Sequence, residues 1–254
     1  MNLDFLLDLA LNASKKAGKA ILNERKSLEI WKKDDGSPLS SADLASNEIL
    51  CEELKKSDLA VCSEEAPLDF DLRKKLSCFW LIDPLDGTKG FLKGEGGFCV
   101  LISLILNQRP TLAVIANPST EEFFYAHSKT VVYKNDKPLE KNETIFQANK
   151  KHALVSIHYP NPKNKAFLDK NQLISTQIGS ALKFIALLEG KAGVYHRFES
   201  LHSWDLAAGD FLLNQNGGLM LGLDKNFISY NQESFLCPAF LAVSKKEFAN
   251  ELIF

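Results

Sequence analysis

The stretch WLIDPLDGTKGF, residues 80–91, carries more acid than a simple turn requires. An apolar segment ends in two carboxylates three residues apart, Asp83 and Asp86, and a glycine and Thr88 follow them. The proline between the acids fixes a turn, so we expect both carboxylates and the Leu85 carbonyl to face one point, while the glycine lets the backbone bend closely. The Thr88 hydroxyl is suited to orienting a water. The stretch therefore predicts a metal cradle, although D-x-x-D-G-T alone also fits a solvated turn.

Acids follow apolar residues at two further places. Glu64 and Glu65 come directly after AVCS, and Asp205 opens the helical pattern WDLAAGDFLL. Carboxylates packed together repel one another unless a cation lies between them. Oxygen ligands with no cysteine or histidine nearby favour a hard ion, Mg²⁺ over Zn²⁺. Each place alone has a plainer interpretation: a surface loop for SEE, and a favourable partner of the helix dipole for Asp205.

Residue spacing excludes other acid-rich and phosphate-binding motifs. An EF-hand that starts at Asp83 requires Glu at its twelfth position, where Gly94 stands. Covalent aspartyl phosphatases of the haloacid dehalogenase type have D-x-D-G-T, in which the two acids are one residue closer together. No G-x-x-x-x-G-K-S/T sequence occurs, so a P-loop is absent. The acids instead fit a site for a hard metal ion.

The composition is that of a soluble globular protein, with 45% hydrophobic and 24% charged residues in 254. A formal net charge of -2 gives no overall attraction to nucleic acid or anionic lipid. The five scattered cysteines form no C-x-x-C pair, which indicates reduced thiols in a cytosolic protein. The longest apolar run, FCVLISLIL from Phe98, is too short to span a bilayer. We therefore expect a cytoplasmic protein with no transmembrane segment and no nucleic-acid polymer as partner.

Hydrophobic periodicity predicts a layered α/β protein in two parts. Residues 1–145 are predicted to form an N-terminal α+β domain that holds the metal-binding acids. Its two amphipathic helices, one at the N-terminus and one starting at SSAD, precede strands at 59–65, 78–87, 98–118, 121–128 and 130–140. Residues 146–254 are predicted to form a C-terminal α/β domain that selects the substrate. It has strands at 153–158, 173–179 and 194–198, a loop at 159–165 followed by a helix before the second strand, and further helices at 180–193 and 203–218.

These acidic stretches resemble the lithium-sensitive, magnesium-dependent phosphomonoesterase superfamily, which includes inositol monophosphatases and fructose-1,6-bisphosphatases. WLIDPLDGTKGF matches its W-I/L-I/V-D-P-I/L-D-G-T signature, SWDLAAGDFLL matches its W-D-x-A-A-G signature, and SEE matches its acidic strand end. Within the superfamily, KDDGSPLSSADLAS, IGSALKFIALLEGKAGVYHRF and ESFLCP are similar to segments of bacterial 3'(2'),5'-bisphosphate nucleotidases.

The resemblance implies an αβαβα sandwich of the inositol monophosphatase and fructose-1,6-bisphosphatase type. It also implies an enzyme that removes the 3'-phosphate of adenosine 3',5'-bisphosphate, a compound left over from sulfate activation, and so gives AMP. Metal-activated water would be the nucleophile, since phosphoryl transfer depends mostly on positioning and charge neutralisation.

Residue roles are implied by the same resemblance. About two or three Mg²⁺ ions would be held by Glu64, Asp83, the Leu85 carbonyl, Asp86 and Asp205. Besides Glu64, catalysis would rest on Asp43 and Thr88: Asp43 would hold a further ion or its water, and the pair would orient and deprotonate the attacking water. The backbone amides of Gly87 and Thr88, together with Lys89, would meet the departing phosphate. The implied substrate contacts are Glu64, Leu85, Asp86, Gly87, Thr88, Ser180, Lys183, Arg197 and Asp205.

Three residues of the second part are expected to select the substrate. Ser180 and Lys183 lie at a predicted helix start, where a hydroxyl, an ammonium and the helix N-terminus converge on an anion. Arg197 is placed to fork onto the same phosphate. The plainer interpretation makes Ser180 an N-cap, Lys183 a solvated residue and Arg197 the partner of an acid.

Two departures from the nucleotidase pattern leave the base and ribose preference open. Gly97 stands where these enzymes have an acid, and SIHYP replaces their S-R-S-H, so His158 or Tyr159 would take over contacts to the nucleotide. The alternative function is an inositol monophosphatase or sugar-phosphate phosphatase, and a third is a non-catalytic metal-binding regulatory module. We expect a small nucleotide bisphosphate as partner and a monomer or homodimer, with or without loose association with the inner face of the cell membrane.

Overall fold

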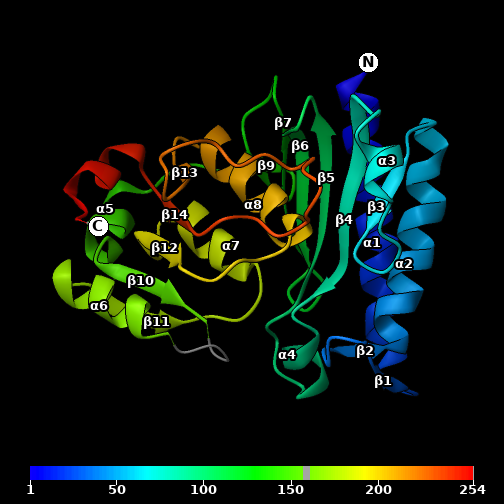
Figure 1. Cartoon of the computed structure of the whole chain (residues 1–254), viewed down its shortest axis with the longest axis horizontal. Helices are drawn as coiled ribbons and strands as arrows, with labels where there is room; N and C mark the ends of the chain where they lie inside the picture. Colours follow the sequence, from blue (N-terminus) through cyan, green and yellow to red (C-terminus); the bar gives the residue numbers. More distant parts are fainter. Residues whose placement is uncertain (157–160, 254) are drawn as a thin grey trace.

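The computed structural model describes residues 1–156 and 161–253, which form five stacked layers in the order helix, sheet, helix, sheet, helix (Figure 1). The N-terminus lies beside the first helical layer and the C-terminus beside the last. This arrangement confirms the αβαβα sandwich that the sequence predicted. Its central helices are covered by a sheet on each side, so the interior of the molecule lies between the two sheets.

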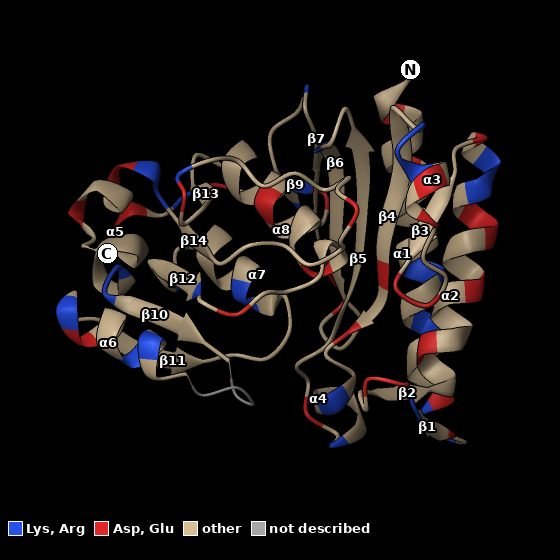
Figure 2. Cartoon of the chain, in the orientation of Figure 1, with Lys and Arg blue, Asp and Glu red and all other residues tan. Residues whose placement is uncertain are grey.

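The first layer consists of α1 (Leu3–Glu24) and α2 (Ser41–Leu54), followed by a 3₁₀ turn, η1 (Lys55–Ser57). The apolar residues of α1 recur at helical spacing and are buried along one face, which packs against the sheet. The outer surfaces of both helices carry charges of both signs (Figure 2). Between them a short hairpin, β1 (Ile30–Lys32) and β2 (Pro38–Ser40), leads into α2.

The second layer is a seven-stranded sheet in which the strands follow chain order. Only the first pair is parallel, and every other neighbouring pair is antiparallel. Alternate residues of β4 face opposite layers: Trp80 and Ile82 pack with α1 and α2, whereas Phe79 and Leu81 pack with the central helices. The strands are β3 (Val61–Ser63), β4 (Cys78–Asp86), β5 (Cys99–Leu106), β6 (Arg109–Asn117), β7 (Glu122–His127), β8 (Tyr133–Lys134) and β9 (Lys137–Pro138).

Two short helices flank β4 in sequence. The helix α3 (Phe70–Arg73) lies between β3 and β4, and α4 (Thr88–Leu92) follows β4 directly. Strand β4 ends at Asp86, within the DPLDGT segment. Helix α4 begins at Thr88 and leads the chain away from this end of the sheet (Figure 1).

The central layer contains α7 (Leu182–Leu188) and α8 (Ser203–Gln215). Helix α8 is buried along nearly its whole length and is apolar on most sides, as expected for a helix between two sheets. Gly209 allows α7 and α8 to approach closely, because a Cβ there would stand 2.2 Å from the Phe184 ring. This contact fixes the position of the helix whose first turn carries Asp205.

The fourth layer is a five-stranded mixed sheet in the order β11-β10-β12-β14-β13. Its strands are β10 (His152–Val155), β11 (Ile174–Gln177), β12 (Val194–Arg197), β13 (Leu219–Gly222) and β14 (Phe240–Val243). The outer layer consists of α5 (Glu143–Asn149), α6 (Pro162–Lys170) and the 3₁₀ helix η2 (Lys246–Glu251). Phe146, Phe167 and Phe248 of this layer pack against the outer face of the sheet.

Several predicted boundaries were wrong. The loop expected at 159–165 is helix from Pro162 onward, because Asn161 caps the helix through its side chain and proline fits the first helical turn. The strand expected at 153–158 begins at His152 and ends at Val155; residues 157 and 158 of that prediction lie outside the described residues. The helix expected at 180–193 covers only Leu182–Leu188. The division of the chain at residue 145 into two domains stays a prediction.

Candidate metal centre and substrate cavity

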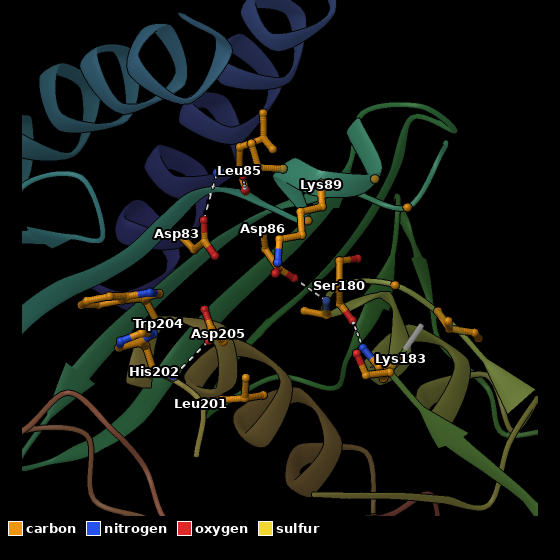
Figure 3. A pocket seen from close by; sticks show the side chains of 18 of the residues that line it. Asp83, Leu85, Asp86, Lys89, Ser180, Lys183, Leu201, His202, Trp204 and Asp205 are labelled. Carbon is orange, nitrogen blue, oxygen red and sulfur yellow. Dashed lines mark hydrogen bonds between the residues drawn. The ribbon is translucent and has the colours of Figure 1, made fainter. Parts of the chain in front are cut away.

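A cavity of about 840 Å³ lies where the first three layers and the second sheet meet (Figure 3). Its walls come from the β1–β2 hairpin, the end of β4, the segment before α7, the end of β12 and the start of α8. Predicted site residues lining it are Glu64, Asp83, Leu85, Asp86, Gly87, Thr88, Lys89, Ser180, Lys183, Arg197 and Asp205. The fold thus gathers at one cavity residues that lie up to 141 positions apart, since Glu64 and Asp205 both belong to it.

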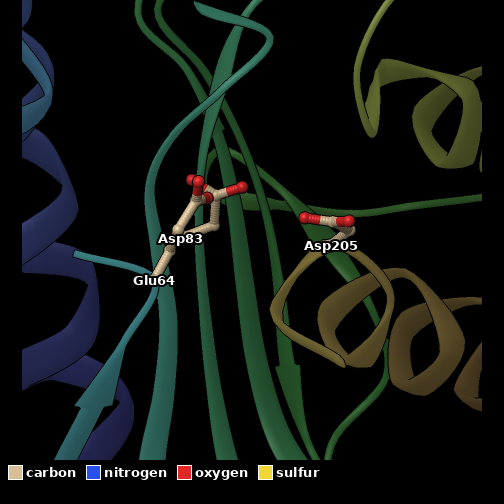
Figure 4. A group of neighbouring side chains, drawn as sticks. All are labelled: Glu64, Asp83 and Asp205. Atoms are coloured by element: carbon tan, nitrogen blue, oxygen red, sulfur yellow. The ribbon is translucent and has the colours of Figure 1, made fainter. Parts of the chain in front are cut away.

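Three of the predicted acids converge at the floor of this cavity. One carboxylate oxygen from each of Glu64, Asp83 and Asp205 lies within 4.8 Å of the others (Figure 4). The parallel pairing of β3 with β4 brings Glu64 beside Asp83, and the Glu64 amide donates to the Ile82 carbonyl at 3.1 Å. Asp205 reaches the pair from the first turn of α8. A distance of this order is what one shared cation requires.

Holding these ionised carboxylates close together without a cation costs free energy. Burial raises the pKa of Asp83 well above its ordinary value, and repulsion from Glu64, Asp86 and Asp205 raises it further. Burial likewise raises the pKa of Asp205, and the carboxylates of Asp86 and Glu64 add to the effect. A divalent cation among these oxygens relieves the repulsion. Because the cluster offers oxygen ligands alone, it fits a hard ion such as Mg²⁺.

Asp86 lies beside the three-acid cluster and faces the second wall of the cavity. Its Oδ2 accepts the backbone N–H of Ala181, at the start of the segment that leads into α7 (Figure 3). The Cys99 thiol lies 3.6 Å from the same oxygen. Burial raises the pKa of Asp86, an effect that the Ala181 hydrogen bond and the charge of Lys183 oppose. Asp86 therefore lies between the cluster of three acids and the side of the cavity that carries Lys183 and Arg197.

Asp43 and Thr88 form the pair that the resemblance implied. The Thr88 hydroxyl lies 3.0 Å from Asp43 Oδ1 and 3.1 Å from the Leu85 carbonyl oxygen, so its single proton has two acceptors within reach. The other Asp43 oxygen accepts the Ser40 amide at 2.8 Å and the Ser40 hydroxyl at 2.6 Å. Burial raises the pKa of Asp43, whereas these hydrogen bonds lower it. The carboxylate is held in one orientation beside the Thr88 hydroxyl.

Gly87 occupies a position that no other residue can take without moving the site. Its φ is +95°, in the left-handed region. A Cβ on Gly87 would stand 2.4 Å from the Gly97 carbonyl oxygen and 2.9 Å from the Ser180 Cβ. The close approach brings the segment after β4 against the segment before α7. It also shows what Gly97, the departure from the nucleotidase pattern, does here: its backbone packs against the turn of the first signature.

The three predicted substrate-selecting residues also face the cavity. Lys183 is only 4% exposed, so its interpretation as a solvated residue was wrong. Its ammonium donates to the Ser180 carbonyl at 2.8 Å, and burial lowers its pKa to about 8 (Figure 3). Ser180 has a positive φ of 51°, and its hydroxyl accepts the Leu182 amide at 3.2 Å, which is a cap-like contact. Arg197 Nε lies 3.6 Å from Glu199 Oε2, so the arginine also has the acidic partner of the plainer interpretation.

The structure adds a residue that the sequence reasoning missed. The Lys33 ammonium lies 2.6 Å from Glu64 Oε1 and 2.7 Å from Glu65 Oε1. Burial alone lowers the pKa of Lys33, but the two carboxylates outweigh burial and raise it above the ordinary value. The K-x-D-G-S-P segment in which Lys33 lies was a usable signal, because that segment carried part of the family resemblance. The predicted nucleotide contacts His158 and Tyr159 lie outside the described residues.

Fold and site together define a layered α/β protein with a cluster of three acids in its cavity. The chain belongs to the inositol monophosphatase family, whose sequence model matches residues 2–253. The 3'(2'),5'-bisphosphate nucleotidase CysQ of Salmonella typhimurium is 32% identical over 242 residues, which cover 92% of this chain and 98% of that protein. The protein of the same name from Escherichia coli K12 is 31% identical over the same shares of both chains.

Solved structures give the same picture. CysQ from Bacteroides thetaiotaomicron, a bacterial member of the inositol monophosphatase family, superposes with a TM-score of 0.81 at 28% identity, covering 94% of this chain and 97% of that chain. The inositol monophosphatase from Anabaena sp. PCC 7120 superposes with a TM-score of 0.79 at 23% identity over 99% and 95% of the two chains, which is a likeness of fold alone. The family predicted from the two signatures is confirmed.

Proposed function

We propose that this protein is a divalent-metal-dependent 3'(2'),5'-bisphosphate nucleotidase, which hydrolyses the 3'-phosphate of adenosine 3',5'-bisphosphate to give AMP and phosphate. The observation that carries the proposal is the position of Glu64, Asp83 and Asp205 within 4.8 Å of one another, in a cavity that Lys183 and Arg197 also line. Similarity to the CysQ nucleotidases over 92% of the chain supports the substrate class.

The metal-binding residues in this proposal are Glu64, Asp83, the Leu85 carbonyl, Asp86 and Asp205, which would hold about two or three Mg²⁺ ions. When bound, the ions supply charge neutralisation at the phosphoryl group and lower the pKa of water. The buried acids of this chain provide the fixed negative charge that such ions need, and the hydrogen bond from Leu85 N–H to Asp83 Oδ1, 3.0 Å long, orients one of the carboxylates.

Asp43 and Thr88 would handle the proton of the attacking water. A water that donates to Thr88 Oγ1 is oriented for attack as the Thr88 proton moves to Asp43 Oδ1, 3.0 Å away. The Ser40 contacts keep Asp43 from turning aside. Phosphate would leave along the Gly87 and Thr88 amides at the N-terminal end of α4, with Lys89 on the same wall.

Lys183 and Arg197 would bind the second phosphate of the substrate. Both side chains are at most 9% exposed and line the cavity opposite the acids, so each offers a poorly solvated positive charge. Charge-assisted contacts of this kind favour a bisphosphate over a monophosphate. Ser180, which lies between Asp86 and Lys183, would donate its hydroxyl to the same anion.

A substrate panel tests the proposal. Phosphate release from adenosine 3',5'-bisphosphate and from inositol 1-phosphate is measured with Mg²⁺ and again after chelation. The expected kcat/KM for the nucleotide is at least about tenfold higher than that for inositol 1-phosphate. This is a modest ratio for a site that binds a polar group of one substrate that the other lacks. Equal or faster turnover of the inositol ester would assign the protein to the inositol or sugar phosphatases. Metal binding without turnover of either ester would favour the regulatory module.

The cellular location, partner and oligomeric state of the enzyme are also part of the proposal. No helix in residues 1–156 or 161–253 is long and apolar enough to cross a bilayer. The five cysteines are free thiols, which supports a reducing compartment such as the cytoplasm. The partner in this setting is a small nucleotide bisphosphate. Monomer and homodimer both stay predictions, as does loose contact with the cell membrane.

A further inference from the structure

A fully buried arginine stands outside the substrate cavity. Arg73, the last residue of α3, is 1% exposed and is among the largest fully buried side chains. Its NH1 donates to Asn231 Oδ1 at 2.9 Å and its NH2 to the Glu233 carbonyl at 3.3 Å, while the Asn231 amide donates back to the Arg73 carbonyl at 3.1 Å. Among the described residues no carboxylate forms an ion pair with it. A buried charge without a counter-ion is expensive, so its retention needs a reason.

Two aromatic rings enclose the guanidinium group. Its central carbon lies 4.1 Å from the ring centroid of Phe235 and 5.4 Å from that of Phe70. Such contacts are stronger for a desolvated cation than for an exposed one. Arg73 thereby holds the Asn231 side chain and the Glu233 carbonyl through hydrogen bonds, and the ring of Phe235 through stacking.

Phe235 in turn fixes the segment that begins α8. Its carbonyl accepts the Ser203 amide at 2.8 Å, and the Leu201 carbonyl accepts the Cys237 amide at 2.8 Å. These bonds pair residues 235–237 with residues 201–203 in an antiparallel bridge. The Phe235 ring also packs against Trp204, with centroids 4.8 Å apart.

The segment 201–204 sets the orientation of Asp205. The His202 amide donates to Asp205 Oδ2 at 3.0 Å, as the reciprocal contact of a capping box (Figure 3). The His202 ring lies parallel to the Trp204 indole, 4.9 Å away between centroids and tilted by 12°. Asp205 is therefore held from the side opposite to Glu64 and Asp83, through contacts that lead back to Phe235.

The other end of this chain of contacts adjoins Glu64. Helix α3 follows the Glu64–Glu65 turn after β3, and the Leu68 amide packs against the Cys62 sulfur at 3.5 Å. Cys62, Leu68 and Phe235 belong to one packed cluster. Arg73 thus connects the element beside Glu64 with the element that carries Asp205, which are the two sides of the acid cluster.

We propose that Arg73 is a positioning residue for the metal centre: through Phe235 and Trp204 it holds the N-terminal turn of α8 at the distance from which Asp205 shares a cation with Glu64 and Asp83. The inference rests on the proposed role of Asp205 as a metal ligand. Residues that orient metal ligands in this indirect way commonly change metal affinity by about 10- to 100-fold when replaced. Arg73 acts on metal binding without touching metal or substrate.

The test measures divalent-cation binding directly, without substrate, by titration calorimetry with Mg²⁺ and by Mn²⁺ paramagnetic resonance. Arg73→Met is expected to weaken cation binding about tenfold or more. Its kcat should recover at saturating Mg²⁺, since the ligands themselves are intact. Phe235→Leu keeps the arginine but removes the stacked ring, so it should shift the affinity in the same direction. This second variant decides the question if Arg73→Met does not fold.

The matched control is Arg109→Met. Arg109 also ties another element to α8, through Asp210 at 2.7 Å, but it does so on the part of the helix beyond the first turn. It should lower the melting temperature and leave cation affinity within about twofold. If Arg73→Met and Phe235→Leu lower the melting temperature in the same way and leave cation affinity unchanged, the proposal is wrong. Asp205→Asn tests the role of Asp205 as a metal ligand separately from the role of Arg73. Unchanged cation binding in that variant would overturn the metal site itself, whatever Arg73 does.

Discussion

The Lys33 ammonium lies 2.6 Å from Glu64 Oε1, so a lysine of the β1–β2 hairpin and an acid of the metal centre form a close ion pair. Glu65 holds the same ammonium at 2.7 Å, and both acids follow β3. Lys33 therefore supplies positive charge at the place where a divalent cation would bind. Glu64 then has two cationic partners that compete for it.

Replacing Lys33 tests this competition. Lys33→Met should tighten Mg²⁺ binding, measured calorimetrically without substrate, by about fivefold, which corresponds to an ion pair of about 1 kcal/mol. The same variant should be less stable than the wild type after chelation, because Glu64 and Glu65 then lose the ammonium that pairs with both of them. Lys56→Met is the matched control, since Lys56 pairs with Glu53 at 2.7 Å on the surface of the first layer. Unchanged or weaker Mg²⁺ binding in Lys33→Met would contradict the competition.

Repulsion among the acids predicts the pH dependence of the cation-free protein. The pKa of Asp83 is raised in the folded state, so the folded protein holds a proton that the unfolded chain releases above its ordinary pKa of 3.8. Stability from this group is therefore greatest at low pH and falls as the pH rises through the raised pKa. Asp83→Asn removes the contribution of this group, while the raised pKa values of Asp86 and Asp205 remain. In chelator at pH 8 the variant should be more stable than the wild type, because a buried neutral amide avoids the cost of the ionised carboxylate.

Denaturant unfolding with and without Mg²⁺ measures the effect. Well below pH 3.8 the two proteins should converge, because Asp83 is then protonated in both the folded and the unfolded state of the wild type. Added Mg²⁺ should stabilise the wild type at pH 8 and leave Asp83→Asn almost unchanged. Asp71→Asn serves as a control, since Asp71 is an exposed acid whose loss should change the stability little. A wild type that is equally stable with and without Mg²⁺ would argue against a shared cation.

The proposed mechanism gives the Thr88 hydroxyl a different role from that of the proposed metal ligands, and kinetics can distinguish the two roles. Thr88→Val keeps the size of the side chain but removes the group 3.0 Å from Asp43. We expect kcat to fall by about 10²- to 10⁴-fold, the usual contribution of general base catalysis, with KM and Mg²⁺ affinity little changed. Thr88→Ser retains the hydroxyl and should keep most of the activity. A Thr88→Val enzyme within tenfold of the wild type would remove Thr88 from the proton path.

The sequence predicted the acids of the site because their signals are local. In DPLDGT, the proline, the glycine and the two acids are neighbours in the sequence, whereas the parallel pairing of β3 with β4 is a finding of the structure. The layered order of helices and sheets was implied by the resemblance to the phosphomonoesterase superfamily, which the same local motifs carry. The structure confirms these layers, and it brings Glu64, Asp83 and Asp205 to one point.

Residues whose role depends on a contact between distant segments were missed. Lys33 meets Glu64 only because the β1–β2 hairpin folds back over the end of β3, and Arg73 meets Phe235 across 162 positions of sequence. Lys33 lies in a polar turn, and Arg73 is followed by two lysines, so neither residue shows a local sign of burial in the sequence. The predicted start of α6 was wrong for a different reason. Asparagine and proline favour both a loop and a capped helix start, and the sequence around them does not distinguish the two. In the structure Asn161 caps the helix, and Phe167 packs against the second sheet.

Lys183 gives a prediction about substrate choice. Lys183→Met should raise KM for adenosine 3',5'-bisphosphate by about 10- to 100-fold, because it removes a charge-assisted contact of about 1.5–3 kcal/mol. Turnover of a monophosphate ester should change far less, since its single phosphate lies at the metal centre. Arg197→Met should show the same selectivity, whereas Lys89→Met should affect both substrates alike, because the proposal places Lys89 at the departing phosphate. Equal losses for both substrates in Lys183→Met would contradict the assignment of Lys183 to the second phosphate.

The same side chain sets a limit on activity at high pH. Burial lowers the pKa of Lys183 to about 8, so the ammonium of the free enzyme loses its proton as the pH rises through that value. Because kcat/KM reports the free enzyme, kcat/KM for the bisphosphate should fall by up to about tenfold per pH unit above pH 8. The monophosphate profile should lack this fall, and so should that of Lys183→Arg, whose guanidinium stays charged. A bisphosphate profile flat to pH 10 would mean that a positive charge at Lys183 is not used in substrate capture.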